Sequence, residues 1–426
     1  MVAADQIRRC VQGSRKIPED LFEMIKVSLD GKPGIFRDTY GPGENAGHRV
    51  MAEYAGRAGL EVTRDAAANT YMTLPGRDRS APRILIGSHL DSVPGGGNYD
   101  GAAGVVAGLT SLAALRAGNI ELPCDVTVMG VRAEESVWFQ VSYIGSRAAL
   151  GTLPEGALEA RRIDTGRTLF EHIAECGGDP AALRNGAPVL SRDNVRAFVE
   201  VHIEQAPTLV QRRQPIAVGA GIPGNFRYPE ARIVGRYDHV GTPRRFRRDA
   251  AMAAADLAMV MDRLWARHEE AGTPVAMTFG RFHTDPAAHG LTTVPGEFGF
   301  SLDVRAYDAG VLSGLENKML VAVERIEAAR QVKFELGPRA SAPVGPMCPK
   351  ITAELNRGVA AMGMDAGSLH SPASHDAAAF SAAGIPTAMI FVRNENGSHN
   401  PLEAMDMDDF LEAAGLLTWW LASCVE

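Results

Sequence analysis

Runs of apolar residues alternate along the chain with stretches in which apolar and polar positions mix, and this pattern predicts strands and helices in turn. The strand-like runs are RILIGS (83–88), DVTVMGV (125–131), VRAFVEV (195–201) and TAMIFV (387–392). Helix-like stretches cover 43–59 and 100–118. Alternating strands and helices favour an α/β fold with a central, mostly parallel sheet.

A central stretch has a different rhythm. Its predicted order is strand, long helix, two strands, helix and strand, which is the order of a ferredoxin-like α+β unit. Gly- and Pro-bearing segments at 215–225 and 337–346 would serve as its hinges. We therefore predict a main domain formed by 1–216 and 339–426, with an inserted domain formed by 217–338.

Composition narrows the class of protein. The 426 residues are enough for two domains, and the formal charge of −8 gives no general attraction to nucleic acid or to an anionic membrane. The five cysteines are scattered and odd in number, which excludes a disulfide framework and fits a reducing compartment. No apolar segment is long enough for a signal peptide or a membrane span. We expect a cytoplasmic protein that binds neither nucleic acid nor membrane.

Polar residues with metal-binding chemistry follow each of the four strand-like runs. They are His89 and Asp100, then Glu134 and Glu135, then His202, and finally His399. Ligands of open α/β sheets lie at the carboxyl ends of strands, so these residues are expected to converge. Imidazoles with carboxylates suit Zn²⁺, Mn²⁺, Co²⁺ or Ni²⁺. Asp100 stands beside Gly101 near a helix start, where its carboxylate could bridge two ions.

Each residue also has an ordinary interpretation. A single histidine after a strand is usually a hydrogen-bonded core or surface residue, and adjacent acids such as Glu134 and Glu135 are usually solvated charges. Such residues at four successive strand ends are much less easily explained as independent events. The coincidence favours a shared site.

Several motifs together resemble one family. They are GSHLDSVPGGGNYDGAAGVVAGL, EE followed by WF and GSRAALG, EVHIEQAPTL, DHVGTP with RRDA, VPGEFGFSLDVR, SHDAA and GIPTAMIFVRNENGSHNPLEAM. Their order and content are similar to the hydantoinase/carbamoylase amidases of the M20 metallopeptidase-like group. That group includes N-carbamoyl-L-amino-acid hydrolases, β-ureidopropionases and allantoate amidohydrolases. The resemblance spans nearly the whole chain.

The resemblance implies a site for two divalent ions, Zn²⁺ or Mn²⁺, with Co²⁺ or Ni²⁺ as further options. One ion would be held by His89, Asp100 and His202, and the other by Asp100, Glu135 and His399. Glu134 would be the general base that takes a proton from the attacking water and passes it to the leaving nitrogen. Asp91 would accept the remaining N–H of His89 and so fix its tautomer. An alternative for Asp91 is a turn cap.

The resemblance also implies that the inserted domain is a lid and a dimerisation domain, and hence that the protein is a homodimer. His239 would reach from the partner subunit to the developing oxyanion, and Arg305 would clamp the substrate carboxylate. Gln205 and Thr292 match further substrate-contacting positions. A surface charge at a strand end is the alternative for Arg305.

This chain departs from the family pattern around the substrate. Trp138 stands where an Arg is expected, and Thr292 replaces an Asn. HVGTPRR, which replaces HAGTTPM, adds Arg244 and Arg245, and PASHDA around Ser374 replaces GAGHDA. The residues expected at the metal site match the family pattern, whereas those expected to contact the substrate differ from it. The sequence is therefore compatible with an aromatic or doubly anionic amide or ureido substrate.

Cleavage of a C–N bond in a small carboxylate-bearing, N-carbamoyl-amino-acid-like substrate is therefore the predicted activity. An M20-like dipeptidase and a hydrolytic deaminase are alternative hypotheses that use the same water. A non-catalytic binding protein is a third, but it would be expected to lack the base or a ligand, and both are present.

Overall fold

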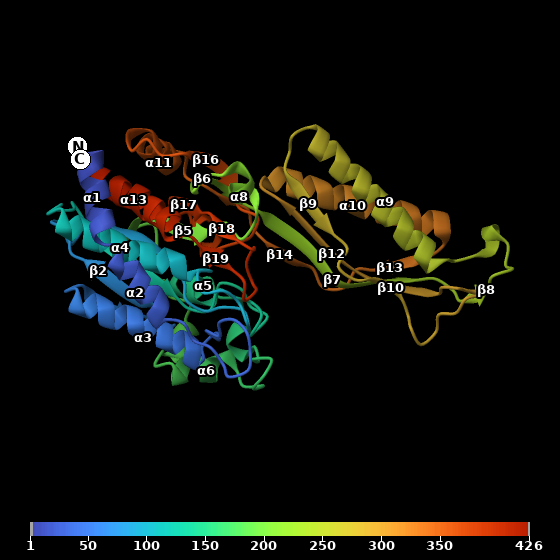
Figure 1. Ribbon diagram of the computed structural model, residues 1–426. Coiled ribbons are helices and arrows are strands. Elements are labelled where there is room, and N and C mark those ends of the chain that lie inside the picture. Colours follow the sequence, from blue (N-terminus) through green and yellow to red (C-terminus); the bar gives the residue numbers. More distant parts are fainter. Residues whose placement is uncertain (1–2, 425–426) are drawn as a thin grey trace. The chain divides into compact units, whose positions relative to one another are not determined.

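Four parallel strands form the centre of the first sheet. In spatial order they are β4 (Val126–Val131), β3 (Arg83–His89), β5 (Val195–Ile203) and β17 (Thr387–Val392), as the computed structural model shows for residues 3–424 (Figure 1). Antiparallel β2 (Thr70–Leu74) extends the sheet beyond β4, and antiparallel β6 (Ile216–Ile222) extends it beyond β17. The outer strands are β1 (Glu61–Arg64), β15 (Gly345–Pro346) and β16 (Ala366–His370).

The two faces of this sheet are covered by separate cores because side chains alternate along each strand. Ile84 and Ile86 pack on one face with the helices α4 (Ala102–Ala117) and α13 (Met407–Ser423). Leu85 packs on the opposite face with residues of α12 (Asp376–Ala382). Burial on both faces explains why the central strands are continuous apolar runs in the sequence. The predicted α/β class with a mostly parallel core is confirmed.

Further helices and short elements complete this part of the chain. They are α1 (Ala4–Gly13), α2 (Lys16–Met24), α3 (Pro42–Arg57), α5 (Ile144–Ala149), η1 (Ala157–Glu159), α6 (Leu169–Glu175), α7 (Pro180–Leu183), α8 (Thr208–Arg212), α11 (Pro349–Ala361), β18 (Asn394–Glu395) and β19 (Ala404–Met405). Within residues 3–424, no helix combines the length and the apolar character needed to cross a membrane.

The chain divides into two compact units. The first comprises Met1–Ile222 and Pro346–Glu426, and the second comprises Pro223–Gly345. Each boundary lies a few residues after the position predicted from the sequence. The reason at the first boundary is that most of the predicted hinge 215–225 is strand β6, whose residues are buried in the central sheet.

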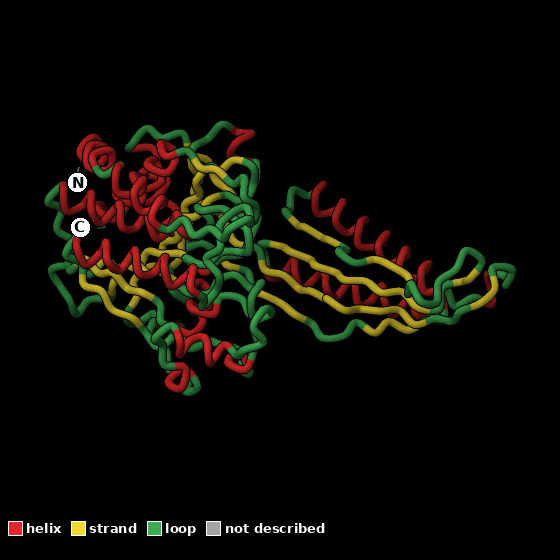
Figure 2. Tube along the Cα trace, turned by 60° about the horizontal axis from the view of Figure 1, so that its bottom comes forward, coloured by secondary structure: helices red, strands yellow, loops and turns green. Residues whose placement is uncertain are grey.

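The second unit has its own antiparallel sheet. The order β9 (Val275–Thr278), β12 (Glu297–Ala306), β7 (Gly224–Val234), β13 (Lys333–Glu335) is that of a ferredoxin-like unit. The helices α9 (Ala250–Glu270) and α10 (Ala309–Arg330) run along β7 and β12 (Figure 2). The remaining elements are β8 (Asp238–His239), η2 (Arg244–Phe246), β10 (Phe282–Thr284), β11 (Thr293–Val294) and β14 (Ala340–Ala342).

One face of this second sheet is closed and the other is open. Strand β12 alternates strictly between buried and half-buried residues, and its buried side chains share a core with both helices. Asp303 and Arg305 belong to the half-buried set. The polar face of the strand is therefore available for interactions outside the core of this unit.

Candidate metal centre

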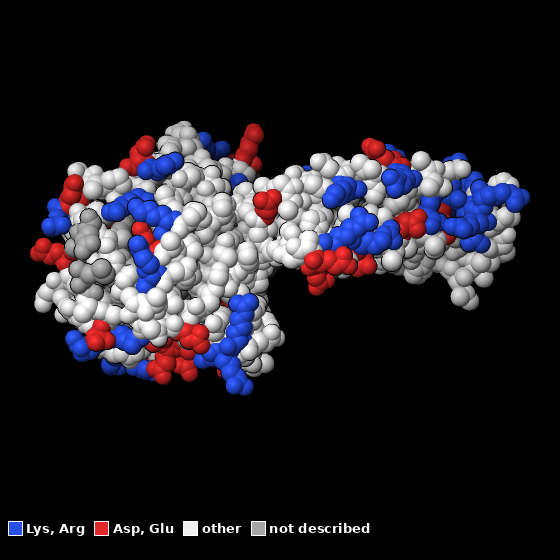
Figure 3. Space-filling model, turned by 90° about the horizontal axis from the view of Figure 1, so that it is seen from above, with Lys and Arg blue, Asp and Glu red and all other residues white. Residues whose placement is uncertain are grey.

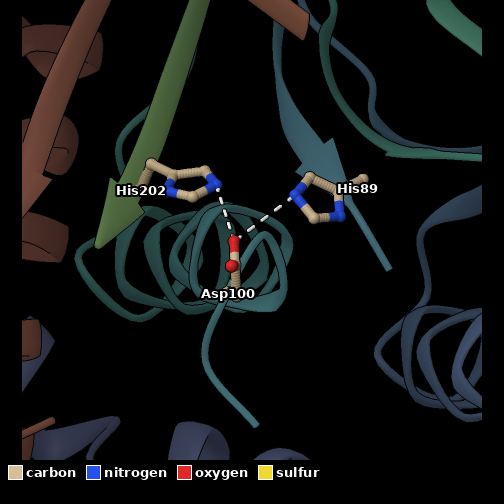
Figure 4. Close-up of side chains that lie close together, drawn as sticks. All are labelled: His89, Asp100 and His202. Carbon is tan, nitrogen blue, oxygen red and sulfur yellow. Dashed lines mark ion pairs between the residues drawn. The ribbon is translucent and has the colours of Figure 1, made fainter. Parts of the chain in front are cut away.

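Strand ends bring His89, Asp100 and His202 together. His89 is the last residue of β3, His202 lies near the end of β5, and Asp100 immediately precedes the turn into α4. Both imidazoles point toward the Asp100 carboxylate (Figure 4). The distances from Asp100 Oδ1 are 3.6 Å to His89 Nε2 and 3.2 Å to His202 Nε2. These three residues form a buried group with the spacing of a metal site.

A second group shares Asp100. His399 Nε2 lies 3.2 Å from Asp100 Oδ2 and 3.4 Å from Glu135 Oε1. Asp100, Glu135 and His399 again have ligand atoms close enough to hold one ion. Each oxygen of Asp100 thus faces a different group, which is the arrangement that a bridging carboxylate requires. The structure brings together all five residues that the sequence suggested as ligands.

Local backbone contacts orient the imidazoles. The Nδ1 atom of His89 lies 3.0 Å from the carbonyl oxygen of Asp91, and His202 Nδ1 lies 2.9 Å from the carbonyl oxygen of Ile203. Nitrogens that donate to carbonyls leave the Nε2 atoms unprotonated and free for an ion. The sequence predicted that the Asp91 carboxylate would take this role. Its Oδ1 is 3.3 Å from His89 Nδ1, but the backbone carbonyl makes the shorter contact.

The Asp91 carboxylate is engaged mainly with the strand-end loop that follows β4. It accepts hydrogen bonds from the backbone N–H groups of Glu134 (3.1 Å) and Glu135 (3.2 Å). The hydroxyl of Thr39 donates a third bond to it. Asp91 therefore positions both glutamates as well as His89.

Unpaired polar atoms show that the residues fit metal ions. Asp100 Oδ1, Glu135 Oε1 and His202 Nε2 are buried and have no hydrogen-bond partner among the described residues. Burying such atoms without a partner costs free energy, and a coordinated cation removes that cost. Imidazole nitrogens and carboxylate oxygens are the donor set of divalent zinc or manganese.

The pKa shifts of the cluster residues follow from their burial and from the charges of their neighbours. Burial, with the nearby Asp100 carboxylate next in effect, raises the pKa of Glu135 to about 7. Burial also acts to raise the pKa of Asp100, but the close imidazoles of His202 and His399 outweigh it and hold that pKa well below its usual range. The hydrogen bond to Asp100 raises the pKa of His399 to about 9. The cluster favours positive charge at its centre.

Glu134 differs from its neighbour Glu135. Its backbone is fixed by Asp91, yet its carboxylate has no hydrogen-bond partner within residues 3–424. Burial raises its pKa well above the ordinary value, although the charge of His89 opposes the shift. A half-buried carboxylate with a raised pKa and unused oxygens is suited to accept and return a proton.

The loops that carry the site adopt conformations that most residues avoid. Ala133, Gln205 and His399 have φ values of 58°, 65° and 60°. Gly101 has φ 64°, and a Cβ atom on it would lie 2.5 Å from atoms of the His89 ring. Left-handed backbone at non-glycine residues costs of order 1 to 3 kcal/mol each and clusters at functional sites.

Sequence reasoning missed the residues that support Asp100. Ser398 Oγ lies 2.6 Å from both Asp100 Oδ2 and Glu403 Oε2, and its single proton can be donated to either oxygen. Glu403 Oε1 accepts the backbone N–H groups of Tyr99 (2.8 Å) and Asp100 (3.2 Å). Gln205 Nε2 also donates to Asp100 Oδ2, at 2.9 Å. Ser398 and Glu403 flank His399 in the sequence, but their spacing alone gives no signal of this role.

A further acidic group beside the site has a structural explanation. Glu200, His202 and His375 lie close enough to be considered as ligands. Both oxygens of Glu200 are occupied, by the hydroxyl of Ser88 and the backbone N–H of Ala377, each at 2.7 Å. His375 Nε2 lies 2.7 Å from Ser371 Oγ. This group fixes the strand-end loops and leaves few donor atoms for an ion.

Of the two departures from the family pattern in the first unit, one is explained by its contacts. The indole N–H of Trp138 donates to the carbonyl of Ser92 at 3.2 Å, and the guanidinium of Arg162 lies 4.4 Å above its ring. The Trp138 ring is therefore packed against Arg162, and its N–H has a hydrogen-bond partner. Ser374 Oγ is buried and has no partner among the described residues. No contact in the structure explains this serine.

Two predicted substrate residues of the second unit lie side by side. Strand β8 pairs with β11, which puts His239 opposite Thr293, and the backbone N–H of Val240 donates to the carbonyl of Thr292. His239 Nδ1 accepts the N–H of Gly241 at 3.1 Å. That bond requires the tautomer with the proton on Nε2, so His239 presents a donor.

Arg305 has a partner on its own strand. Its guanidinium makes bonds of 3.1 and 3.2 Å to the two oxygens of Asp303, and Arg227 lies 2.8 Å from the same carboxylate. The guanidinium N–H groups that were expected to bind a substrate carboxylate are therefore paired with Asp303 in this structure. A substrate carboxylate would have to replace it.

Known proteins resemble the whole chain. The sequence pattern of the peptidase family M20/M25/M40 matches residues 85–422. An N-carbamoyl-L-amino acid amidohydrolase from Geobacillus stearothermophilus is 33% identical over 422 residues, which cover 97% of this chain and 99% of that protein. The allantoate amidohydrolase of Escherichia coli (strain K12) is 29% identical over 411 residues, with 95% and 96% covered.

A solved structure agrees with these relatives. An amidase of the hydantoinase/carbamoylase family from Burkholderia multivorans superposes with a TM-score of 0.83 at 27% identity, covering 97% of this chain and 98% of that one. The resemblance inferred from the motifs is confirmed. The chain belongs to the peptidase family M20/M25/M40, among its hydantoinase/carbamoylase-type amidohydrolases.

Proposed function

We propose that the protein hydrolyses an amide or ureido C–N bond in a small carboxylate-bearing substrate of the N-carbamoyl-amino-acid type, using two divalent ions. The observation that carries the proposal is that two ligand groups share Asp100. Bound ions would lower the pKa of a water molecule and polarise a carbonyl oxygen. His89, Asp100 and His202 would hold one ion, and Asp100, Glu135 and His399 the other.

Glu134 would act as the general base. Its carboxylate has no competing hydrogen bond among the described residues, and its raised pKa suits a group that takes a proton from water and returns it to a leaving nitrogen. Asp91 would keep it in place through its backbone N–H. Gln205, which donates to Asp100, would lie beside the substrate.

The second unit would complete the site of a partner subunit in a homodimer. His239 would donate its Nε2 proton to the developing oxyanion, with Thr292 nearby. Arg305, at the opposite end of β12, would hold the substrate carboxylate. Exposed apolar side chains beside these residues support a covered surface, since Leu291 is fully exposed and Val240 is 47% exposed. Residues of this kind usually become buried in an interface.

Zn²⁺ or Mn²⁺ is the proposed metal, because the donors are imidazoles and carboxylates without any thiolate. We also propose a cytoplasmic location. All five cysteines are free thiols, as a reducing compartment would keep them.

Product analysis with metal-loaded protein tests the reaction. N-carbamoyl amino acids should release ammonia together with CO₂, whereas a deaminase would release ammonia alone and a dipeptidase would release two amino acids from a dipeptide. Chelator treatment should abolish turnover, and the metal should restore it. Turnover that survives complete metal removal would disprove the proposal.

Two matched variants test the division of roles between neighbouring residues. Glu134→Gln should keep both ions and lose turnover by about a hundredfold or more, because only the proton acceptor is removed. Glu135→Gln should lose one ion per chain, because a ligand is removed. Metal loss in Glu134→Gln with retention in Glu135→Gln would mean that the roles are exchanged.

A further inference from the structure

Residues 236–248 of the second unit, here called the basic loop, carry an unusual concentration of positive charge. Five of them are arginines, namely Arg236, Arg244, Arg245, Arg247 and Arg248. Figure 3 shows Lys and Arg side chains gathered at the end of the second unit that carries β8. The chain as a whole has a formal charge of −8, so this concentration is a local feature.

Two of the arginines build the loop. Arg247 donates to the carbonyl of Thr242 at 2.7 Å and also to the carbonyl of Val240. Arg236 pairs with Asp238 at 3.0 Å. The loop is further tightened by Thr242, whose hydroxyl donates to Asp238 at 2.7 Å. These contacts hold the backbone in one shape and account for Arg236 and Arg247.

Arg244 and Arg245 are left without such a role. They form most of the short helix η2, both are exposed, and within residues 3–424 neither has an acidic partner. The guanidinium of Arg245 lies 4.6 Å from the ring of Phe246, which is itself 55% exposed. The stacking restrains the arginine while its N–H donors stay free. An unpaired guanidinium is suited to bind a carboxylate through two hydrogen bonds.

The two arginines line hollows on the surface of this unit. Arg244 borders two adjoining cavities of about 770 and 530 Å³, and Arg245 borders the smaller one. The acids in the walls are already used, because Asp256 pairs with Arg330 and Asp249 caps helix α9. The positive charge of Arg244 and Arg245 therefore remains uncompensated.

His239 lies within the same loop. Its ring accepts a hydrogen bond from Gly241, and Gly241 forms part of the wall of the larger cavity. Arg244 and Gly241 line the same cavity, so a group bound there would lie next to the turn that carries His239.

We propose that Arg244 and Arg245 bind a second acidic group of the substrate, so that the preferred substrates are dianions such as N-carbamoyl derivatives of acidic amino acids. This inference rests on the proposed function, in which Arg305 takes the first carboxylate. Arg305 and the basic loop lie at opposite ends of β12, so the two acidic groups would be bound by Arg305 of one subunit and by the basic loop of its partner. A hollowed surface with two free guanidinium groups fits a small carboxylate, whereas an extended polyanion would meet the negative charge of the rest of the chain.

A substrate pair of nearly equal shape tests the proposal. N-carbamoyl-L-aspartate carries a second carboxylate where N-carbamoyl-L-asparagine carries a neutral amide. The unaltered protein should hydrolyse the dianion with a kcat/KM about ten- to a hundredfold higher, as expected for charge-assisted hydrogen bonds. In Arg244→Gln/Arg245→Gln this preference should disappear, with little change for the asparagine derivative. Arg244→Lys/Arg245→Lys should restore part of it.

The control is Arg263→Gln/Arg267→Gln on helix α9, which removes the same charge at exposed positions away from the basic loop. It should keep the preference for the dianion. An equal loss of preference in the control would show that the effect is general electrostatic attraction and would overturn the proposal.

Equal hydrolysis of both substrates by the unaltered protein would overturn the proposal while leaving the proposed function intact. Hydrolysis of neither N-carbamoyl compound, with turnover only on dipeptides or aminoaryl acids, would overturn the proposed function itself. Binding of heparin that depends on Arg244 and Arg245, without any substrate preference, would identify a polyanion surface in place of this site.

Discussion

The strand-end cluster of the first unit and the β8–β11 region of the second unit hold their polar side chains in opposite ways. In the cluster, Asp100 and His202 are buried, and Asp100 accepts hydrogen bonds from both Gln205 and Ser398. In the β8–β11 region, His239 and Thr292 are exposed. The cluster is fixed by contacts within its own chain. The exposed region offers donors that have nothing to bind within their own unit.

This difference suggests a division of roles, with the strand-end cluster serving the chemical step and the β8–β11 region serving the choice of substrate. A metal site must have its ligands placed to within a few tenths of an ångström, so its supports are buried and numerous. Substrate contacts can lie on exposed elements that meet the substrate only in the assembled enzyme. Changes in the first region should therefore affect metal and turnover, while changes in the second should affect binding and assembly.

Asp100→Ala should give the largest effect. The change removes the only residue shared by both ligand groups, so both ions should be lost and turnover should fall by about a thousandfold or more. Metal content by elemental analysis and activity at saturating metal measure the two losses. The exposed Asp193→Ala is the control and should behave as the unaltered protein. A variant that still holds two ions would show that Asp100 does not bridge them.

Subunit mixing tests the exposed region. Glu134→Gln and His239→Ala should each reduce turnover by about a hundredfold. Equimolar mixing with subunit exchange makes half of the dimers mixed, and one of the two sites in a mixed dimer has both an intact base and an intact donor. About a quarter of the original activity should return. Absence of recovery, with mixed dimers detected by mass spectrometry, would place His239 in its own chain's site or outside the reaction.

Most of the metal cluster could be predicted from the sequence because it follows a rule of topology. The central strands are buried on both faces, which makes them visible as apolar runs, and the residue after each run must lie at the same sheet edge. His89, Glu135 and His202 follow directly from this rule. The supporting roles of Ser398 and Glu403 do not, because they depend on how the chain folds back around Asp100.

The boundary between the two units, after Ile222, lies within the predicted hinge 215–225, but most of that segment is strand β6. Gly219 and Gly221 lie in this strand, where an added Cβ at Gly219 would come within 2.8 Å of Met389. Small residues there permit close packing against the neighbouring strand. The pairing of Arg305 with Asp303 was also not predicted, although residues two apart on a strand share a face.

Gly101→Ala should give an intermediate effect. The new Cβ would press on the His89 ring, and the left-handed backbone adds strain, so metal affinity should fall by about ten- to a hundredfold. Gly156→Ala is a matched control because Gly156 is also left-handed, with φ 74°, but has no atom within 4 Å of the added Cβ. The control should lose about 1 kcal/mol of stability and no metal affinity. Equal metal loss in both would assign the effect to backbone strain.

Arg305 should give the smallest effect, and the direction of the change is informative. Arg305→Ala should raise KM for carboxylate-bearing substrates by about tenfold and change kcat little, because the contact is made equally before and during the reaction. Esters of the same substrates should be affected less.

Asp303 pairs with the guanidinium of Arg305 and so competes with the substrate carboxylate. Asp303→Asn should weaken this competition and lower KM by about two- to threefold. Arg227→Ala removes the other cation beside Asp303 and should leave KM nearly unchanged, or raise it slightly by tightening the hold of Asp303 on Arg305. Opposite shifts in KM for Arg305→Ala and Asp303→Asn would identify the pair as a gate for the substrate carboxylate, whereas parallel increases would show that Asp303 and Arg305 act together to shape the open face of β12.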